Sequence, residues 1–293
     1  MSAANRLRAL LAAPEPVVAP GAPDPLTALL AQEAGFAALH GTGGGIVRGL
    51  GQPDLGQFGL AELVARIGAI TEVCPLPIIV DVDSGFGGPL PLARAIRLLA
   101  RVDAAAVHVE DREVPRRSID PRDDIMPPGT MVGRIRAALA ARGETGPLVI
   151  ARTDSRPAIG LEAAIDRANC YADAGADIVY VEFIKLREDI EAVARRVEAP
   201  KLIAVTRGET APLTVAELGQ MGFRIVVFPA DAQLATLHAV RAVLTHIRDN
   251  GTAEGFARMA TMADRNSLVG TGAAQAFELE HLGGCPPGRC GID

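Results

Sequence analysis

Short apolar runs alternate along the chain with longer segments whose apolar residues recur every three or four positions. The short runs are apolar on both faces, which is typical of strands in a parallel sheet that helices cover on both sides. The predicted strands cover residues 17–19, 37–40, 78–83, 105–110, 148–152, 178–182, 202–205 and 225–228. The predicted helices cover residues 24–34, 60–71, 91–102, 130–142, 161–174, 187–197, 214–221 and 231–249. Eight such units in 293 residues favour the α/β class and a (β/α)8 barrel of the TIM type over an open sheet.

The domain organisation follows from the same pattern. We expect a single barrel domain over residues 1–293, with residues 271–293 as a flexible tail. The glycine-rich stretch 41–45 does not have the G-x-G-x-x-G spacing of a dinucleotide-binding sheet. Cys285 and Cys290 lie in the tail, where they could form a disulfide or half of a zinc site, but no further Cys or His cluster completes four ligands. A chain end without chemistry is the favoured interpretation.

Composition and charge exclude two classes of partner. Only 3% of the residues are aromatic and the net charge is -6, so the sequence lacks both the stacking platforms and the cationic surface that nucleic-acid binding requires. It also contains no run of roughly 18 apolar residues that could cross a bilayer. The first residues lack the sustained apolar core of a secretory signal. We therefore expect a cytoplasmic protein with a small-molecule substrate.

The stretch from Asp81 to Gly88 carries the first chemical signal. Asp81 and Asp83 follow the apolar run 77–80, and the strand predicted there would point both carboxylates to the same face. Two adjacent carboxylates repel each other unless a cation separates them, and oxygen ligands suit Mg²⁺ or Mn²⁺. The sequence therefore predicts a divalent-metal site at the end of a strand. The alternative is that the pair caps the following helix.

Other polar residues also gather where predicted strands end, which is where a barrel of this type places its active site. They are Thr42, Gly43, Gly44, His108, Glu110, Asp111, Arg152, Thr153, Asp154, Glu182, Thr206 and Arg207. The loop over residues 112–128 is longer than a connection needs and has no apolar period, as in many active-site lids. Its Arg116 and Arg117 could clamp a carboxylate or a phosphonate, or could simply face solvent.

With these motifs the chain resembles the isocitrate lyase and phosphoenolpyruvate mutase superfamily, from about Arg6 to Gly270. The resemblance is carried by Pro-Asp-Leu-Gly at 53–56, Asp-x-Asp-x-Gly-Phe-Gly at 81–87, His-Val-Glu-Asp at 108–111, Ala-Arg-Thr-Asp at 151–154, and Ala-Gly-Ala-Asp at 174–177 followed by Glu182. It implies a (β/α)8 barrel whose eighth helix is exchanged with a neighbouring subunit, in a homotetramer built from dimers. It also implies Mg²⁺ and an enolate of pyruvate, or of a similar 2-oxo acid, formed while a carbon-carbon or carbon-phosphorus bond is made or broken.

The resemblance also assigns roles to residues. Asp83 resembles the direct metal ligand, and Asp81, Glu110 and Asp54 resemble residues that hold metal-bound waters. The segment Thr42, Gly43 and Gly44 resembles the donors to a substrate carboxylate. Arg152 resembles the residue that binds the 2-oxo or 2-hydroxy oxygen, and Glu182 stands where several lyases keep an acidic residue.

The lid departs from the family pattern. The lyases that act on isocitrate or methylisocitrate carry Lys-Arg-Cys-Gly-His there, whereas this chain has Arg116, Arg117, Ser118, Ile119 and Asp120. Ser118 is a poorer proton donor than a thiol, so we expect Asp120 or Glu182 to move the proton. The Lys-Thr-Asn-Ser of the mutases is absent, and Ala204 stands where methylisocitrate lyases place an Asn.

The leading hypothesis is a Mg²⁺-dependent carbon-carbon lyase that acts on a short 2-oxo or 2-hydroxy dicarboxylate and leaves a pyruvate-type enolate. Oxaloacetate decarboxylation and methylisocitrate-type or dimethylmalate-type cleavage are the specific candidates. One alternative is phosphorus-carbon chemistry, as in a phosphonopyruvate hydrolase or a carboxyphosphonoenolpyruvate mutase. The other is an oxo-acid-binding protein without catalysis, because a fold and its ligand site do not guarantee turnover.

Overall fold

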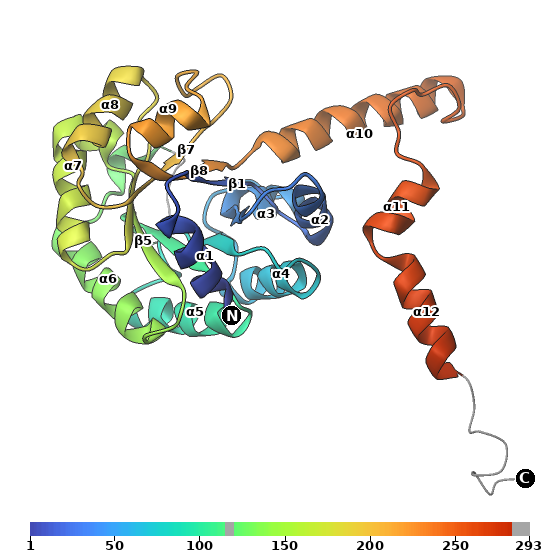
Figure 1. Ribbon diagram of the computed structural model, residues 1–293. Coiled ribbons are helices and arrows are strands. Elements are labelled where there is room, and N and C mark those ends of the chain that lie inside the picture. Colours follow the sequence, from blue (N-terminus) through green and yellow to red (C-terminus); the bar gives the residue numbers. More distant parts are fainter. Residues whose placement is uncertain (115–119, 283–293) are drawn as a thin grey trace, which may run out of the picture. The chain divides into compact units, whose positions relative to one another are not determined.

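The computed structural model describes residues 1–114 and 120–282, in which strands and helices alternate as the sequence predicts (Figure 1). The strands are β1 (Val17–Pro20), β2 (Leu39–Gly41), β3 (Ile78–Asp81), β4 (Ala106–Glu110), β5 (Leu148–Thr153), β6 (Ile178–Val181), β7 (Lys201–Ala204) and β8 (Phe223–Phe228). The helices are α1 (Ala3–Ala12), α2 (Pro25–Glu33), α3 (Gly43–Gly49), α4 (Leu60–Val73), α5 (Pro89–Arg101), α6 (Pro128–Arg142), α7 (Arg156–Asp173), α8 (Arg187–Arg196), α9 (Val215–Gln220), α10 (Asp231–Asn250), α11 (Met262–Leu268) and α12 (Thr271–Leu282).

The described strands form one parallel, nearly closed barrel. Its eight strands follow the order β1-β8-β7-β6-β5-β4-β3-β2, so the two ends of the sheet are β1 and β2. A single parallel bridge between Gly21 and His40 joins these ends, and the Ala22 amide donates to the His40 carbonyl at 2.8 Å. The predicted TIM-type barrel is thereby confirmed.

The register across the barrel places polar residues side by side at the carboxyl ends of the strands. Asp81 pairs with His108 across β3 and β4, and Glu110 pairs with Arg152 across β4 and β5. Arg152 in turn pairs with Tyr180 on β6. Paired residues on parallel strands face the same side of a sheet, so these side chains share the barrel interior at one end. That end is where a barrel of this kind carries its chemistry.

The opposite end of the barrel is closed by α1, a helix that the sequence analysis did not predict. Leu7 of α1 is fully buried against apolar strand residues such as Ile79 and Ile150. The Ala3 amide donates to Asp103 at 2.9 Å, and Arg224 donates to the Leu11 carbonyl at 2.9 Å. A second apolar layer lies between the strands and the outer helices. The barrel interior is thus packed below the polar end.

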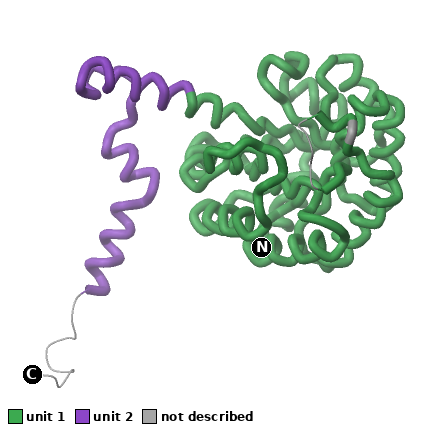
Figure 2. The backbone as a smooth tube through the Cα atoms, turned by 180° about the vertical axis from the view of Figure 1, so that it is seen from behind, with its two compact units in different colours: residues 1–237 green, residues 238–293 purple. Residues whose placement is uncertain are grey.

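The chain divides into two compact units, residues 1–237 and residues 238–293 (Figure 2). The first unit holds the whole barrel. The second holds most of α10 together with α11 and α12, and none of these helices buries a residue. Within the described ranges no helix is long and apolar enough to span a membrane.

Candidate active site

The turn after β3 places Asp83 differently from the expectation. The strand ends at Asp81, and Asp83 has a left-handed backbone with φ of 47°, so it is not the next same-face position of an extended strand. The Asp83 amide instead donates to Oδ1 of Asp81 at 3.0 Å, which folds the chain back over the strand end. Gly88, without a side chain, is the N-cap of α5, so the alternative in which the Asp pair caps this helix is wrong.

Glu110, the last residue of β4, lies against this turn. Its amide donates to the Asp83 carbonyl at 3.0 Å, and the Ser84 hydroxyl lies 3.3 Å from its Oε1. The Glu110 side chain is fully buried. A buried carboxylate requires polar partners, because desolvation otherwise disfavours the charged form. The structure therefore brings three predicted metal-site residues, Asp81, Asp83 and Glu110, to one place.

Arg152 lies at the centre of this acidic group. Its Nη2 is 3.6 Å from Oε2 of Glu110 and 3.8 Å from Oε2 of Glu182, and its Nη1 is 3.9 Å from Oδ2 of Asp81. Burial alone would lower the pKa of Arg152, but Asp154, Glu182, Glu110 and Asp81 outweigh it and hold the pKa well above its usual value. The Tyr180 ring centroid lies 5.4 Å from its guanidinium carbon. Arg152 is therefore permanently charged, and its guanidinium lies against the Tyr180 ring.

The orientation of Arg152 is set by Asp154, to which the sequence analysis assigned no role. The Asp154 carboxylate accepts hydrogen bonds from Nε of Arg152 at 2.6 Å and from Nη2 at 3.1 Å. This two-point contact fixes the plane of the guanidinium. The Asp154 amide donates in turn to Oδ1 of buried Asp111 at 2.9 Å. The roles of Asp111 and Asp154 could have been predicted from the sequence, because they belong to the two motifs that also contain Glu110 and Arg152.

Asp111 is anchored by donors from β5 and α7. Its Oδ2 accepts from the Thr153 hydroxyl at 2.7 Å, the Tyr171 hydroxyl at 2.8 Å and Nη1 of Arg167 at 3.2 Å. Burial raises the pKa of Asp111, and the hydrogen bonds from Thr153 and Asp154 oppose that rise. This buried network ties β4, β5 and α7 together directly behind Arg152. It gives the site a rigid support.

The predicted carboxylate-binding segment opens α3 beside Asp81. The sequence analysis predicted no helix over residues 41–45, but α3 begins at Gly43, and the Thr42 hydroxyl caps it by accepting from the Gly45 amide at 3.2 Å. A Cβ on Gly43 would lie 3.2 Å from Oδ2 of Asp81. A Cβ on Gly44 would lie 2.7 Å from Oδ2 of Asp54. The two glycines therefore let the backbone approach both carboxylates closely.

Two histidines fill the barrel directly below the acidic group. Nε2 of His40 and Nε2 of His108 are 3.0 Å apart, and Nδ1 of His108 is 3.4 Å from Oδ1 of Asp81. Burial and then the charge of Arg152 lower the pKa of His108 to about 3, and burial with His108 lowers the pKa of His40. Both rings are therefore neutral at physiological pH, and they form a polar floor to the site.

The two candidate proton carriers have different surroundings. Burial raises the pKa of Glu182, although Arg152 opposes the rise. Asp120 is the N-cap of a short 3-10 helix (Pro121–Asp123), and its hydrogen bonds with Arg122, at 2.8 Å from Nε to Oδ2, lower its pKa. A group with a raised pKa exchanges protons more readily near neutrality, which favours Glu182. Arg116, Arg117 and Ser118 lie outside the described residues.

The donor set fits a Mg²⁺ ion that keeps most of its water. Within the described ranges no three His, Cys, Asp or Glu side chains form a ready-made metal cage. Mg²⁺ is usually held by one or two carboxylates and retains several waters, so a cage of protein ligands is not required. Asp81, Asp83 and Glu110 supply oxygen donors alone, and the missing side chains of Gly43 and Gly44 leave space beside Asp81 and Asp54. One direct carboxylate with others reached through water is consistent with this geometry.

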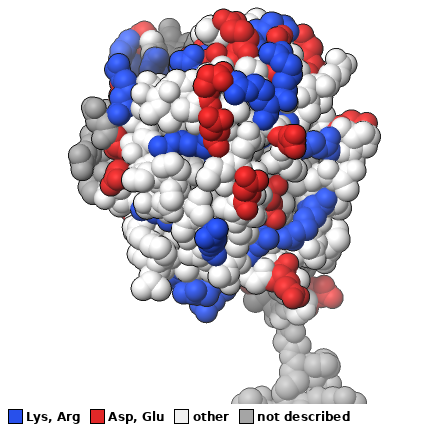
Figure 3. Space-filling model, turned by 90° about the vertical axis from the view of Figure 1, so that its left-hand side faces the viewer, with Lys and Arg blue, Asp and Glu red and all other residues white. Residues whose placement is uncertain are grey.

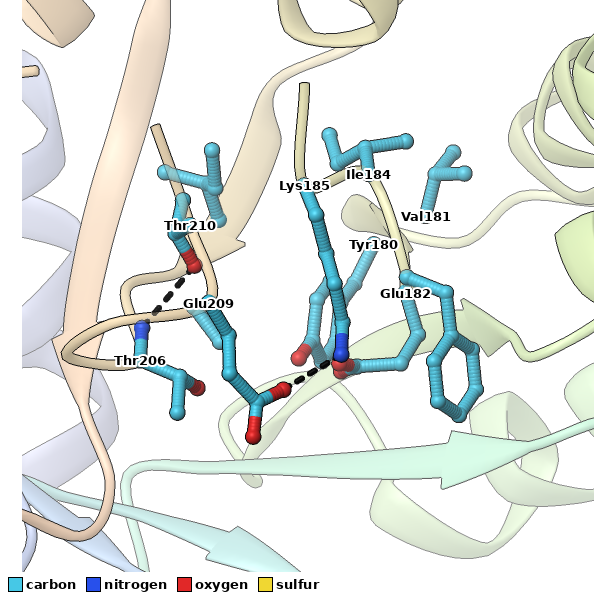
Figure 4. A pocket seen from close by; sticks show the side chains of 11 residues that line it. Tyr180, Val181, Glu182, Ile184, Lys185, Thr206, Glu209 and Thr210 are labelled. Carbon is cyan, nitrogen blue, oxygen red and sulfur yellow. Dashed lines mark hydrogen bonds and ion pairs between the residues drawn. The ribbon is translucent and has the colours of Figure 1, made fainter. Parts of the chain in front are cut away.

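A pocket lies between the ends of β6 and β7 and the loops that follow them (Figure 4). Its wall includes Tyr180 and Glu182, both of which lie beside Arg152, so the pocket lies next to the acidic site. The remaining lining residues come from the ends of β6 and β7 and the loops that follow them: Val181, Phe183, Ile184, Lys185, Ile203, Ala204, Thr206, Glu209 and Thr210.

Comparison with known proteins shows the family to which the chain belongs. Residues 7–248 match the family model described as phosphoenolpyruvate phosphomutase. The chain is 39% identical to the 2-methylisocitrate lyase of Aeropyrum pernix, over 90% of this chain and 86% of that protein.

Solved structures show the same relationship. The crystal structure of 2,3-dimethylmalate lyase superposes with a TM-score of 0.87 at 33% identity, covering 96% of this chain and 99% of that one. A phosphonopyruvate hydrolase in complex with oxalate and Mg²⁺ gives a TM-score of 0.89 at 27% identity, covering 97% and 100%. The chain therefore belongs to the phosphoenolpyruvate mutase/isocitrate lyase superfamily, as one of its carbon-carbon lyases.

Proposed function

We propose that the protein is a Mg²⁺-dependent lyase that breaks a carbon-carbon bond in a short 2-oxo or 2-hydroxy acid and releases pyruvate. The observation that carries the proposal is the position of Arg152, a cation whose side chain is only 16% exposed and lies within 4 Å of Glu110, Glu182 and Asp81. A fixed positive charge surrounded by oxygen donors suits a reaction in which negative charge develops on a substrate oxygen. The lyases among its relatives support the choice of a carbon-carbon bond.

Asp83 would hold the metal directly, with Asp81, Glu110 and Asp54 binding its waters. When bound, Mg²⁺ supplies charge neutralisation at the substrate oxygen. Mn²⁺ has a similar preference for oxygen ligands and should substitute for it. The 27% identical phosphonopyruvate hydrolase, solved with oxalate and Mg²⁺, supports the choice of metal.

Thr42, Gly43 and Gly44 would bind the substrate carboxylate, and Arg152 would bind the 2-oxygen. For a 2-hydroxy acid, the hydroxyl loses its proton and the C2–C3 bond breaks as the C2=O bond of pyruvate forms. The electron pair of the broken bond passes to C3 of the departing fragment, which then takes up a proton. For oxaloacetate, CO₂ departs and the pair remains on the enolate of pyruvate. In both reactions Arg152 stabilises charge on the 2-oxygen.

Glu182 would accept the hydroxyl proton, because it lies 3.8 Å from the residue that binds that oxygen and burial raises its pKa. Asp120 is the less suitable carrier, since its pairing with Arg122 lowers its pKa. Arg116, Arg117 and Ser118 lie outside the described residues, and we propose that they contact the substrate. Ser118 replaces the cysteine of the related lyases, so we assign it contact with the departing group.

The test is release of pyruvate from purified full-length protein with Mg²⁺. The panel contains oxaloacetate, 2-methylisocitrate, 2,3-dimethylmalate and phosphonopyruvate. Pyruvate from at least one carbon substrate, abolished by a chelator and restored by Mg²⁺, is the expected result. Phosphate release from phosphonopyruvate alone would transfer the assignment to phosphorus-carbon chemistry. Tight oxalate binding without any turnover would indicate a binding protein.

We also propose that the helices of residues 238–293 pack against a second copy of the chain, in an assembly built from dimers with an exchanged helix. Leu237, Val240, Leu244 and Ile247 of α10 are each at least 40% exposed and recur at helical spacing. Phe277 and Leu279 of α12 are 64% and 75% exposed. Apolar stripes of this extent usually mark an interface. Light scattering should give four times the 30.5 kDa of one chain, the mass of the expected homotetramer.

A further inference from the structure

The residues that line the pocket between the loops after β6 and β7 indicate which substrates the site can accept. It begins at Tyr180 and Glu182, beside the guanidinium of Arg152, and extends to Lys185, Thr206 and other residues of these two loops (Figure 4). A substrate whose 2-oxygen lies at Arg152 would therefore direct its next carbons toward this pocket. This inference rests on the proposed function, because it takes Arg152 as the residue that binds the 2-oxygen.

The charges of the pocket wall do not suit a fragment with two carboxylates. Among the described lining residues the cation is Lys185, whereas Glu182 and Glu209 are both acidic. Nζ of Lys185 is paired with Oε2 of Glu209, and in Figure 4 the two side chains point toward each other across the pocket. A carboxylate that enters must therefore share a cation that is already neutralised. A second carboxylate would lie near the carboxylates of Glu182 and Glu209, and the like charges would repel each other.

The rest of the wall is apolar or carries neutral hydroxyls. Ile184 and Ile203 are buried apolar residues, and Ala204, which also lines the pocket, has a small side chain. The Thr210 hydroxyl accepts from the Thr206 amide at 3.0 Å, which fixes the loop after β7. Threonine hydroxyls can donate to one carboxylate, and the apolar wall can hold a methyl group.

We propose that this pocket receives the departing part of the substrate and selects a dicarboxylate over a tricarboxylate. The substrate class is a four-carbon 2-oxo or 2-hydroxy dicarboxylate with at most small alkyl substituents, whose departing part carries no more than one carboxylate. Cleavage of 2,3-dimethylmalate yields pyruvate and propionate, which meets this condition, and decarboxylation of oxaloacetate also meets it. Cleavage of 2-methylisocitrate yields pyruvate and succinate, whose two carboxylates do not. Glu209 is the specificity-determining residue, because it neutralises Lys185.

The experiment compares kcat/KM for oxaloacetate, 2,3-dimethylmalate and 2-methylisocitrate in the Mg²⁺-loaded full chain, with and without Glu209→Gln. The wild type should prefer a dicarboxylate. Glu209→Gln frees the Lys185 ammonium for a second carboxylate, so the ratio of 2-methylisocitrate to 2,3-dimethylmalate should rise about fivefold, the size expected of one partly exposed charge contact. Lys185→Met should not raise this ratio. A wild type that prefers 2-methylisocitrate, or a ratio unchanged by Glu209→Gln, would overturn the proposal.

A control variant and a binding measurement separate the possible failures. Glu162 of α7 pairs with Arg196 of α8, and both side chains are exposed and lie outside the pocket. Figure 3 shows one side of the barrel, on which acidic and basic side chains intermingle. Glu162→Gln removes the same charge outside the pocket and should leave the ratio unchanged. If no substrate yields pyruvate, the proposed function fails. The affinities of propionate and succinate for the protein loaded with Mg²⁺ and pyruvate, measured by calorimetry, then decide which fragment the pocket prefers. Tighter binding of succinate to the wild type would contradict the proposed preference.

Discussion

Asp154 holds one edge of the Arg152 guanidinium, with Nε 2.6 Å from Oδ1 and Nη2 3.1 Å from Oδ2. The other edge is thereby directed toward Asp81, Glu110 and Glu182. An arginine side chain has several rotatable bonds, and ordering it at the moment of reaction would cost free energy. Because Asp154 is itself tied to buried Asp111, the cation is oriented before the substrate arrives.

Replacing Asp154 by Asn should therefore lower activity without removing Arg152. The amide keeps the size of the side chain but loses the charge-assisted, two-point contact. We expect kcat/KM for the substrate that the pyruvate-release panel identifies to fall about 10- to 100-fold, as is usual when a supporting residue behind a catalytic group is changed. Asp173→Asn, on the exposed end of α7, is the control and should retain activity. Full activity of a folded Asp154→Asn variant would show that Arg152 is oriented by other means.

The pH dependence should follow Glu182. Burial raises its pKa above the usual 4.5, so its protonated form persists to a higher pH than in an exposed Glu. A base must be ionised to accept a proton, and therefore kcat/KM should rise with pH through this raised pKa. Glu182→Gln should lower kcat and flatten that acidic limb. An unchanged acidic limb in Glu182→Gln would assign the titration to another group.

Tyr171 should matter for stability, because its hydroxyl donates to the carboxylate of fully buried Asp111 at 2.8 Å. Hydrogen bonds to charged groups contribute about 1.5–3 kcal/mol, so Tyr171→Phe should lower the free energy of unfolding by about that amount. Tyr180→Phe is the matched control, since no hydrogen bond of the Tyr180 hydroxyl is found within residues 1–114 and 120–282. Denaturant titration of both variants makes the comparison. Equal stabilities would show that the Asp111 network contributes nothing to folding.

Gly44 should be needed for the metal site. A Cβ there would lie 2.7 Å from Oδ2 of Asp54 and closer still to Nη1 of Arg48, so Gly44→Ala must displace at least one of these side chains. Because Asp54 would bind a metal water, the Mg²⁺ concentration for half-maximal activity should rise about tenfold, within the range seen when residues around a metal are changed. Gly49→Ala, at the other end of the same helix, has open space around its Cβ and should leave the Mg²⁺ concentration for half-maximal activity unchanged. Identical Mg²⁺ dependence in the two variants would remove Asp54 from the metal site.

The barrel could be predicted because its signal is local and repeated. Each buried strand from Ile78–Asp81 to Phe223–Phe228 is a short apolar run, and such runs are apolar on both faces only in a covered parallel sheet. Helix α1 was missed because its burial against Ile79 depends on the closed barrel and not on its own pattern. Helix α3 was missed because three glycines at its start normally disfavour a helix.

The site could be predicted only in part. The motifs named Asp81, Glu110 and Arg152, and the barrel brings them together as strand neighbours. The left-handed turn at Asp83 could not be read from alternation, because Asp rarely adopts that conformation without local hydrogen bonds. The chain from Tyr171 through Asp111 to Asp154 also escaped prediction, since it joins residues 60 positions apart in sequence. Contacts between distant segments follow from the fold and not from any local pattern.

The most direct measurement of the central claim is a crystal structure of the protein soaked with Mn²⁺ and oxalate. Mn²⁺ gives an anomalous signal that locates the ion, and oxalate reproduces the paired oxygens of a pyruvate enolate. We expect one strong anomalous peak with an oxygen of Asp83 as a direct ligand, waters shared with Asp81 and Glu110, and an oxalate oxygen within hydrogen-bond distance of Arg152. A peak elsewhere, or no peak at millimolar Mn²⁺ with Arg152 still paired to Asp154, would contradict the proposed metal-assisted lyase.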